Sequence, residues 1–288
     1  MLDGFNLPLT EDEKKKKESV FKNLHERYRD YSDPWGFNLE TVKSALDIVY
    51  PLYCKYFRVR VFGAENIKDE TYMVVSNHTG QIPIDGVLIT TAFAMEAVHK
   101  RILHSMIERF MAGLPFLGDL TAQAGSILGD RENCKWLLNN KESILVFPEG
   151  VRGISKSTKH FYQVQKFSNG FYRIALESKV KILPVAVVGA EEMFPFVLQA
   201  KGIAKHLGLP SLPLSANLVP LPSPIDIYFG EPIEVDLSLD RDAPDKNIRP
   251  KVKEVEDSIK SMLSSGLKEK RPLVGDLIKP FKKVLKNL

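Results

Sequence analysis

A histidine and an aspartate lie close together in a loop that follows an apolar segment. Residues 76–86 read SNHTGQIPIDG, so six residues separate His78 from Asp85. A carboxylate that accepts a hydrogen bond from one imidazole nitrogen leaves the other nitrogen able to take a proton from an alcohol. The segment therefore predicts a general base, with a purely structural histidine as the alternative.

A second loop of chemical interest reads FPEGVRG and spans residues 147–153. Gly150 and Gly153 would let the backbone approach a ligand, and Arg152 offers a planar cation suited to an oxyanion or a phosphate. Taken alone, this loop could be an ordinary turn with a solvated arginine. A third stretch, GSILGDR at 125–131, is rich in glycine and ends in a basic residue, which is a weak signal by itself.

The elements that must hold these loops alternate between strands and helices. The apolar segments 72–76 and 144–147 read as buried strands, and each ends where one of the two main loops begins. Because parallel strands end at the same edge of a sheet, both loops would open on that edge, where ligands bind in open α/β sheets. The pattern predicts an α/β fold with a mixed, mainly parallel central sheet flanked by helices. Further strands are expected at 58–62, 182–188 and 226–229, and helices at 84–97, 104–112, 132–140 and 169–178.

We expect three regions along the chain. Residues 1–57 would form amphipathic helices, whose apolar side chains pack either on a membrane surface or on the protein's own core. Residues 58–240 would form the catalytic domain, and 241–288 would form C-terminal helices. The last thirteen residues, DLIKPFKKVLKNL, are basic and amphipathic. This pattern is typical of a helix on a membrane surface, with a docked terminal helix as the alternative.

Composition and missing motifs argue against several classes of protein. The net charge of +4 is too small to indicate wholesale nucleic-acid binding, and no run approaches the roughly 18 apolar residues of a spanning helix. The N-terminus does not read as a secretory signal, which favours a reduced, cytoplasmic protein. The sequence lacks GxSxG, Walker, GxGxxG, HExxH and CxxC patterns, which argues against a serine hydrolase, an NTPase, a Rossmann enzyme and a bound metal.

Taken together, the loops resemble the motifs of the glycerolipid acyltransferase family, which includes 1-acyl-glycerol-3-phosphate acyltransferases. Asn77, His78 and Asp85 are similar to the family's Asn-His and Asp block, and FPEG with Arg152 is similar to its third block. Residues 125–131 and the ILPV segment at 182–185 are similar to the second and fourth blocks. The likeness spans about residues 58–235 and implies a glycerol-3-phosphate acyltransferase-like fold.

The resemblance implies transfer of an acyl group from a thioester of coenzyme A or acyl carrier protein to a lipid hydroxyl. His78 would be the general base, and Asp85 would orient it. No metal or redox cofactor would be required, and the enzyme would work as a peripheral protein on the inner face of a membrane. The acceptor would be bound, usually through its phosphate, by Asn77, Arg131, Glu149, Gly150 and Arg152.

Two departures from the family pattern bear on catalysis and on the acceptor. Four residues usually separate the histidine from the aspartate, whereas here Pro83 occupies the expected carboxylate position. The lysine that many phosphate-acceptor members carry is absent from the FSNG segment at 167–170, and GVR with a following Tyr-x-x-x-Lys looks more like members that acylate neutral alcohols. The expected acceptor is a lysophospholipid such as 1-acyl-glycerol-3-phosphate. The alternatives are a neutral, diacylglycerol-type alcohol and a non-catalytic lipid-binding protein.

Overall fold

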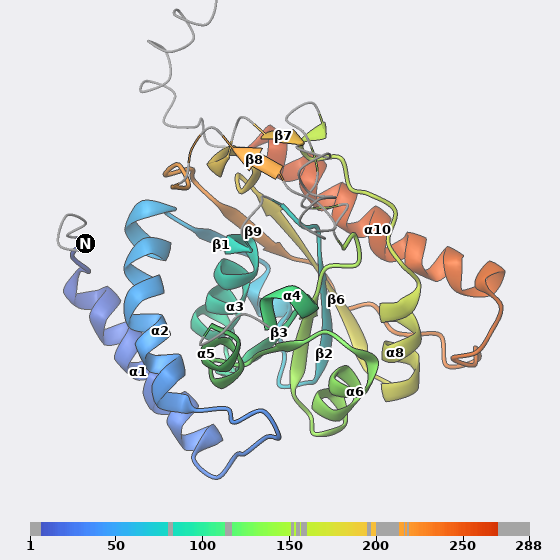
Figure 1. The fold of residues 1–288 in the computed structure, drawn as a ribbon, viewed down its shortest axis with the longest axis horizontal. Coiled ribbons are helices and arrows are strands. Elements are labelled where there is room, and N and C mark those ends of the chain that lie inside the picture. The colour runs from blue at the N-terminus through green and yellow to red at the C-terminus, as the bar shows by residue number, and fades with distance from the viewer. Residues whose placement is uncertain are drawn as a thin grey trace, which may run out of the picture.

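A seven-stranded sheet lies at the centre of the computed structural model (Figure 1), in the order β1-β9-β6-β2-β5-β3-β4. A separate antiparallel pair joins β7 (Val197–Gln199) to β8 (Pro213–Ser215). The structure describes residues 7–79, 83–112, 117–150, 153, 156, 160–194, 197–199, 213–215, 217 and 219–269. The strands of the large sheet are β1 (Arg60–Phe62), β2 (Tyr72–Ser76), β3 (Leu103–Ile107), β4 (Ser126–Leu128), β5 (Ser143–Val146), β6 (Lys181–Val188) and β9 (Asp226–Phe229).

Most of the strands in the large sheet are parallel. β6, β2, β5, β3 and β4 run in one direction, whereas β9 pairs antiparallel with β6, and β1 pairs parallel with β9. The prediction of a mixed, mainly parallel sheet is therefore confirmed. The loops that follow β2, β3, β4 and β5 leave the sheet at one shared edge.

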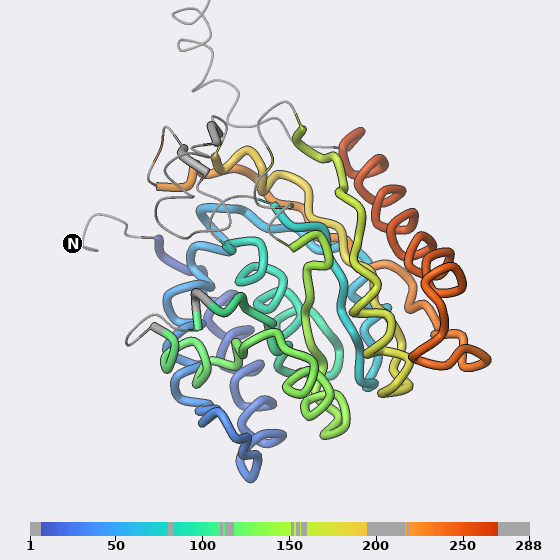
Figure 2. The backbone as a smooth tube through the Cα atoms, turned by 45° about the vertical axis from the view of Figure 1, so that its right-hand side comes forward, coloured from blue at the N-terminus to red at the C-terminus, as the bar shows by residue number. Residues whose placement is uncertain are grey.

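Helices cover both faces of the sheet, as Figures 1 and 2 show. A parallel sheet requires this cover because both of its faces are apolar. On one side lie α1 (Glu11–Tyr28), α2 (Leu39–Pro51) and α3 (Ile84–Glu96), and on the other lie α6 (Arg131–Asn139), α8 (Gly170–Ser178) and α10 (Asp245–Lys268). Shorter elements are the π-helical turn Leu52–Tyr56, the 3₁₀ turns Ala64–Asn66 and Glu191–Met193, α4 (Arg109–Ala112) and α5 (Leu117–Gln123).

The core is divided into two layers by the alternation of side chains along each strand. In β2, Val74 packs with the cluster under α1, α2 and α3, whereas Met73 and Val75 pack with the cluster under α6, α8 and α10. The same alternation separates Leu183 from Ile182 in β6. Successive strand side chains point to opposite faces, so one continuous apolar run supplies both layers.

The N-terminal helices pack on the protein's own core. α1 begins with a capping box in which Thr10 and Glu13 bond to each other's backbone N–H, and its apolar stripe of Val20, Leu24 and Tyr28 is buried. The lysines behind Glu13 are partly neutralised, since Lys16 pairs with Glu96 of α3 and Lys17 pairs with Asp47 of α2. Packing on the protein's own core, one of the two alternatives predicted for residues 1–57, therefore accounts for this apolar stripe. Contact of residues 1–57 with a membrane stays a prediction.

The helix predicted at 104–112 is wrong. Residues 103–107 form strand β3, which pairs with β5 on one side and β4 on the other, and only Arg109–Ala112 is helical. Short apolar runs fit either periodicity, and the two neighbouring strands decide the outcome here. Among the residues that the structure describes, no helix is long and apolar enough to cross a membrane. The tail expected at 276–288 lies outside the described residues.

Burial predicts how strongly α1 contributes to stability. Leu24 is fully buried beneath α1, whereas Leu237 is 66% exposed. Leu24→Ala is expected to lower the free energy of unfolding by about 2–5 kcal/mol, because it leaves a cavity in the core. Leu237→Ala should change this free energy by no more than about 0.5 kcal/mol. Urea denaturation measures both values, and equal effects would show that α1 is not part of the cooperative core.

Candidate active site

A cleft of about 430 Å³ opens at the sheet edge where the parallel strands end. Its walls come from the ends of β3, β4 and β5, from the loop after β2, and from the sides of α6 and α8 that face the sheet. His78 lines this cleft together with Phe147, Pro148 and Gly150 of the second loop. The two loops predicted to meet at one edge therefore do meet, because β2 and β5 are adjacent and parallel.

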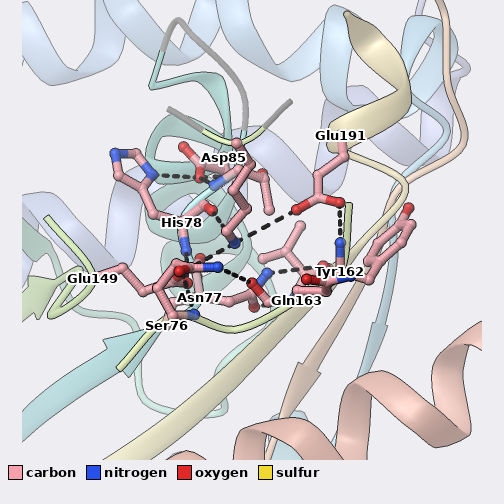
Figure 3. A network of polar contacts seen from close by, with 12 residues as sticks. Ser76, Asn77, His78, Asp85, Glu149, Tyr162, Gln163 and Glu191 are labelled. Carbon is pink, nitrogen blue, oxygen red and sulfur yellow. Dashed lines mark hydrogen bonds and ion pairs between the residues drawn. The ribbon is translucent and has the colours of Figure 1, made fainter. Parts of the chain in front are cut away.

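The side chains of His78 and Asp85 lie within hydrogen-bond distance. Nδ1 of His78 is 2.8 Å from Oδ2 of Asp85, and Figure 3 shows the two side chains directed toward each other. Asp85 is fully buried in the first turn of α3 and also accepts hydrogen bonds from the N–H of Thr79 at 2.8 Å and of Gly86 at 2.8 Å. A carboxylate with these donors can only accept from the imidazole, so Nδ1 carries the hydrogen and Nε2 is free to take a proton.

The longer spacing between His78 and Asp85 does not separate them. Pro83 lies immediately before α3, so α3 places Asp85 one residue inside its first turn. The non-catalytic alternative is based on the wider spacing and on the amphipathic ends of the chain, and the 2.8 Å contact removes the first of these reasons. Whether the pair is catalytic stays a prediction.

The imidazole of His78 is held against an aromatic ring. The rings of His78 and Phe147 are stacked, with centroids 4.1 Å apart and an angle of 20° between their planes. Only 13% of the His78 side chain is exposed. The ring therefore has one face covered, one nitrogen bonded to Asp85, and an edge on the cleft.

Asn77 joins two strands, and its predicted role in binding the acceptor stays a prediction. Its Oδ1 accepts from the N–H of Val187 at 2.9 Å, and its Nδ2 donates to the carbonyl of Val187 at 3.3 Å. The side chain is fully buried. Asn77 thus ties the end of β2 to β6, and the geometry gives it no contact with the cleft.

Glu149, also predicted to bind the acceptor, is buried between backbone groups. Its Oε1 accepts from the N–H of His78 at 3.0 Å, and its Oε2 accepts from the N–H of Gln165 at 2.8 Å. Only 1% of the residue is exposed. A direct contact between this carboxylate and a substrate is a prediction that the geometry does not support.

The remaining predicted residues divide between the cleft and the outer surface. Gly150 lines the cleft with φ of 56°, a left-handed conformation that glycine adopts without strain. Arg131 does not line it, because its guanidinium bonds to Glu177 of α8 at 2.8 Å. Its role as an acceptor ligand remains a prediction without geometric support, and Arg152 lies outside the described residues.

Arg109 is a cleft residue that the sequence analysis missed. It lies two residues after the end of β3, at the start of α4, and lines the cleft as an exposed cation. The pattern of residues 104–112 predicts a single helix, which leaves no strand end to bring Arg109 to this edge. The N-terminus of α8 also reaches the cleft through Gly170, and Asn169 before it makes no side-chain cap. The open N–H groups of that turn add positive potential.

The inner part of the cleft is apolar and includes a thiol. Met106, Leu128, Phe171 and Ile174 line it together with Cys134 of α6. Burial, assisted by the nearby carboxylate of Asp130, raises the pKa of Cys134 to about 12. Among the described residues, no group of three or more His, Cys, Asp or Glu side chains is placed to hold a metal ion.

Comparison with known proteins agrees with this geometry. The acyltransferase family model matches residues 58–188, which include both loops. A protein of Mycobacterium tuberculosis, described as uncharacterized, is 36% identical over 219 residues, which are 71% of this chain and 60% of that protein. A protein of Bos taurus named DGAT1/2-independent enzyme synthesizing storage lipids is 24% identical over 75% of this chain and 65% of its own length. The chain thus spans about 60% of the mycobacterial relative.

The fold is also found in a solved structure. The crystal structure of the 1-acyl-sn-glycerophosphate acyltransferase of Thermotoga maritima superposes with a TM-score of 0.52 and 18% identity, and covers 92% of this chain and 86% of that one. At this identity the match concerns the fold alone. The match of residues 58–188 to the acyltransferase family model confirms the resemblance drawn from the two loops. The acyltransferase family model thus matches residues 58–188 of this chain, and the fold is similar to that of the 1-acyl-sn-glycerophosphate acyltransferase of Thermotoga maritima.

Proposed function

We propose that the protein is an O-acyltransferase that transfers a fatty acyl group from a thioester to the hydroxyl of a lysophospholipid such as 1-acyl-glycerol-3-phosphate. The observation that carries this proposal is the His78–Asp85 pair, whose free imidazole nitrogen belongs to a ring lining the cleft. The donor would be coenzyme A or acyl carrier protein, and the protein would act peripherally on the inner face of a membrane.

The geometry supports a direct transfer. Nε2 of His78 takes the proton of the acceptor hydroxyl while the hydroxyl oxygen attacks the carbonyl carbon of the thioester. The tetrahedral intermediate then collapses, the C–S bond breaks, and the leaving sulfur takes the proton from the imidazolium. Asp85 stabilises the imidazolium and keeps its Nδ1–H in place throughout.

The polar and apolar parts of the cleft suit a lysophospholipid. Arg109 and the N-terminal turn of α8 supply positive charge for a phosphate, in a cleft whose lining also includes Glu108 and Asp130. The apolar wall that contains Met106, Phe171 and Ile174 suits a hydrocarbon chain. The relative from Thermotoga maritima is named for the same class of acceptor.

A neutral acceptor of the diacylglycerol type is the second candidate. It is favoured by the engagement of Arg131 with Glu177, which leaves the cleft with fewer cations than the family pattern implies. The bovine relative is named for storage-lipid synthesis. The two candidates share the same proton transfer at His78 and differ in whether the cleft must neutralise a phosphate.

Replacing the proposed base tests the reaction itself. His78→Ala should lower kcat for ester formation from acyl-coenzyme A and lysophosphatidate by about 10²- to 10⁴-fold, the range of general-base catalysis. His25→Ala, a change on the exposed side of α1, is the matched control and should retain wild-type activity. Transfer of radiolabelled acyl groups, repeated with acyl carrier protein as donor, provides the measurement. Equal turnover by wild type and His78→Ala would refute acyl transfer by this base.

Replacing the two arginines separates the candidate acceptors. Arg109→Met should raise the KM for lysophosphatidate by about tenfold or more, because one charge-assisted hydrogen bond is lost. The KM for diacylglycerol should stay within about twofold of the wild-type value. Arg131→Met should leave both values within about twofold because its guanidinium pairs outside the cleft. Efficient acylation of diacylglycerol but not of lysophosphatidate by the wild type would favour the neutral acceptor. A KM effect at Arg131 but not at Arg109 would contradict the assignment of the phosphate site.

A further inference from the structure

A buried lysine lies directly behind the main chain of His78. Lys156 is 8% exposed, and its Nζ donates to the carbonyl oxygen of His78 at 3.2 Å. The same ammonium lies 3.0 Å from Oε2 of Glu149 and 3.6 Å from Oε1 of Glu191. The ammonium thus lies within hydrogen-bond distance of two oxygen atoms and within ion-pair distance of a third, and Lys156 does not line the cleft.

The charged groups of this cluster are buried, so each of them must keep its partners at short distances. Glu149 and Glu191 are 1% and 2% exposed and approach the cluster from two directions (Figure 3), so neither charge is screened by water. Burial raises the pKa of Glu191 to about 7, against the opposing effect of Lys156. Glu149 is the nearer of the two carboxylates to Lys156, at 3.0 Å against 3.6 Å for Glu191. A buried ammonium requires such a partner because the free energy of its desolvation is large.

Lys156 and Glu149 together hold both ends of the His78 main chain. Glu149 accepts from the N–H of His78 at 3.0 Å, and Lys156 donates to its carbonyl oxygen at 3.2 Å. Gly153 closes the remaining side, since a Cβ at that position would lie 2.7 Å from Cβ of His78. The backbone of His78 has little room to shift while these two hydrogen bonds are present.

We propose that Lys156 is a positioning residue for proton transfer by His78, acting through the His78 carbonyl and through Glu149 rather than on the substrate. This inference rests on the proposed function, because it assigns Lys156 a part in the same reaction. Hydrogen bonds to Asp85 and stacking on Phe147 set the orientation of the imidazole, and Lys156 sets the position of the backbone that carries it. A displacement of about 1 Å at a reacting group can cost about 10²-fold in rate.

Lys156→Met tests the proposal through the separation of kcat from KM. The variant should lower kcat by about 10²-fold and leave the KM of both substrates within about twofold, because no substrate contact is lost. Lys181→Met is the matched control, since Lys181 also pairs with two carboxylates, Glu70 and Glu234, but lies at the start of β6. The control should retain wild-type kcat. A kcat within threefold of wild type, or a KM that rises in proportion to the loss, would overturn the proposal.

A second variant tests the proposal if Lys156→Met does not fold. A second measurement tests it if the proposed function is wrong. Lys156→Met/Glu191→Gln removes one of the two carboxylates left unpaired, so it should fold even where the single variant does not, and it should show the same kcat defect. Hydrogen exchange of the peptide that contains 76–79 requires no substrate. It should be about tenfold faster in the Lys156 variants than in Lys181→Met. Unchanged exchange would overturn the positioning role, whereas a wild type without turnover would overturn only the proposed function.

Discussion

The hydrogen bond between His78 and Asp85 depends on two elements that meet at an angle. β2 ends at Ser76 in the middle of the sheet, and α3 begins at Ile84, so the carboxylate and the imidazole approach from opposite ends of one short loop. The His78–Asp85 contact is present although the sequence has two more residues between them than the family pattern. The positions of β2 and α3 therefore determine the contact between these two side chains. The number of residues between His78 and Asp85 matters less.

Among the described residues of the two loops, Asn77 and Glu149 hold the backbone rather than line the cleft. Asn77 bonds to Val187, and Glu149 bonds to His78 and Gln165. Loops that leave buried strands carry N–H and C=O groups that no neighbouring strand can pair, and an unpaired buried group is costly. A short buried amide or carboxylate at each strand end satisfies these groups. This leaves His78, Phe147 and Gly150 to face the cleft.

The sequence allowed the sheet, its direction and the meeting of the two loops to be predicted, because buried strands and their following loops have strong local patterns. It did not reveal β3, since LHSMI fits a helix as well as a strand until β5 and β4 pair with it. The roles of Asn77 and Glu149 also could not be predicted, because the direction of a side chain depends on which backbone groups lie nearby after folding. Lys156 gave no signal for the same reason, as a lysine is usually solvated and its burial arises from Glu149 and Glu191.

The burial of Cys134 has a chemical consequence for a cleft that would receive a thioester. A cysteine beside an activated acyl group could capture it by exchange between sulfurs, which would leave the protein acylated on its own wall. Only the thiolate attacks efficiently, and a pKa of about 12 keeps the sulfur of Cys134 protonated at physiological pH. If the cleft receives a thioester as proposed, the apolar surroundings of Cys134 would thus also disfavour acylation of its sulfur.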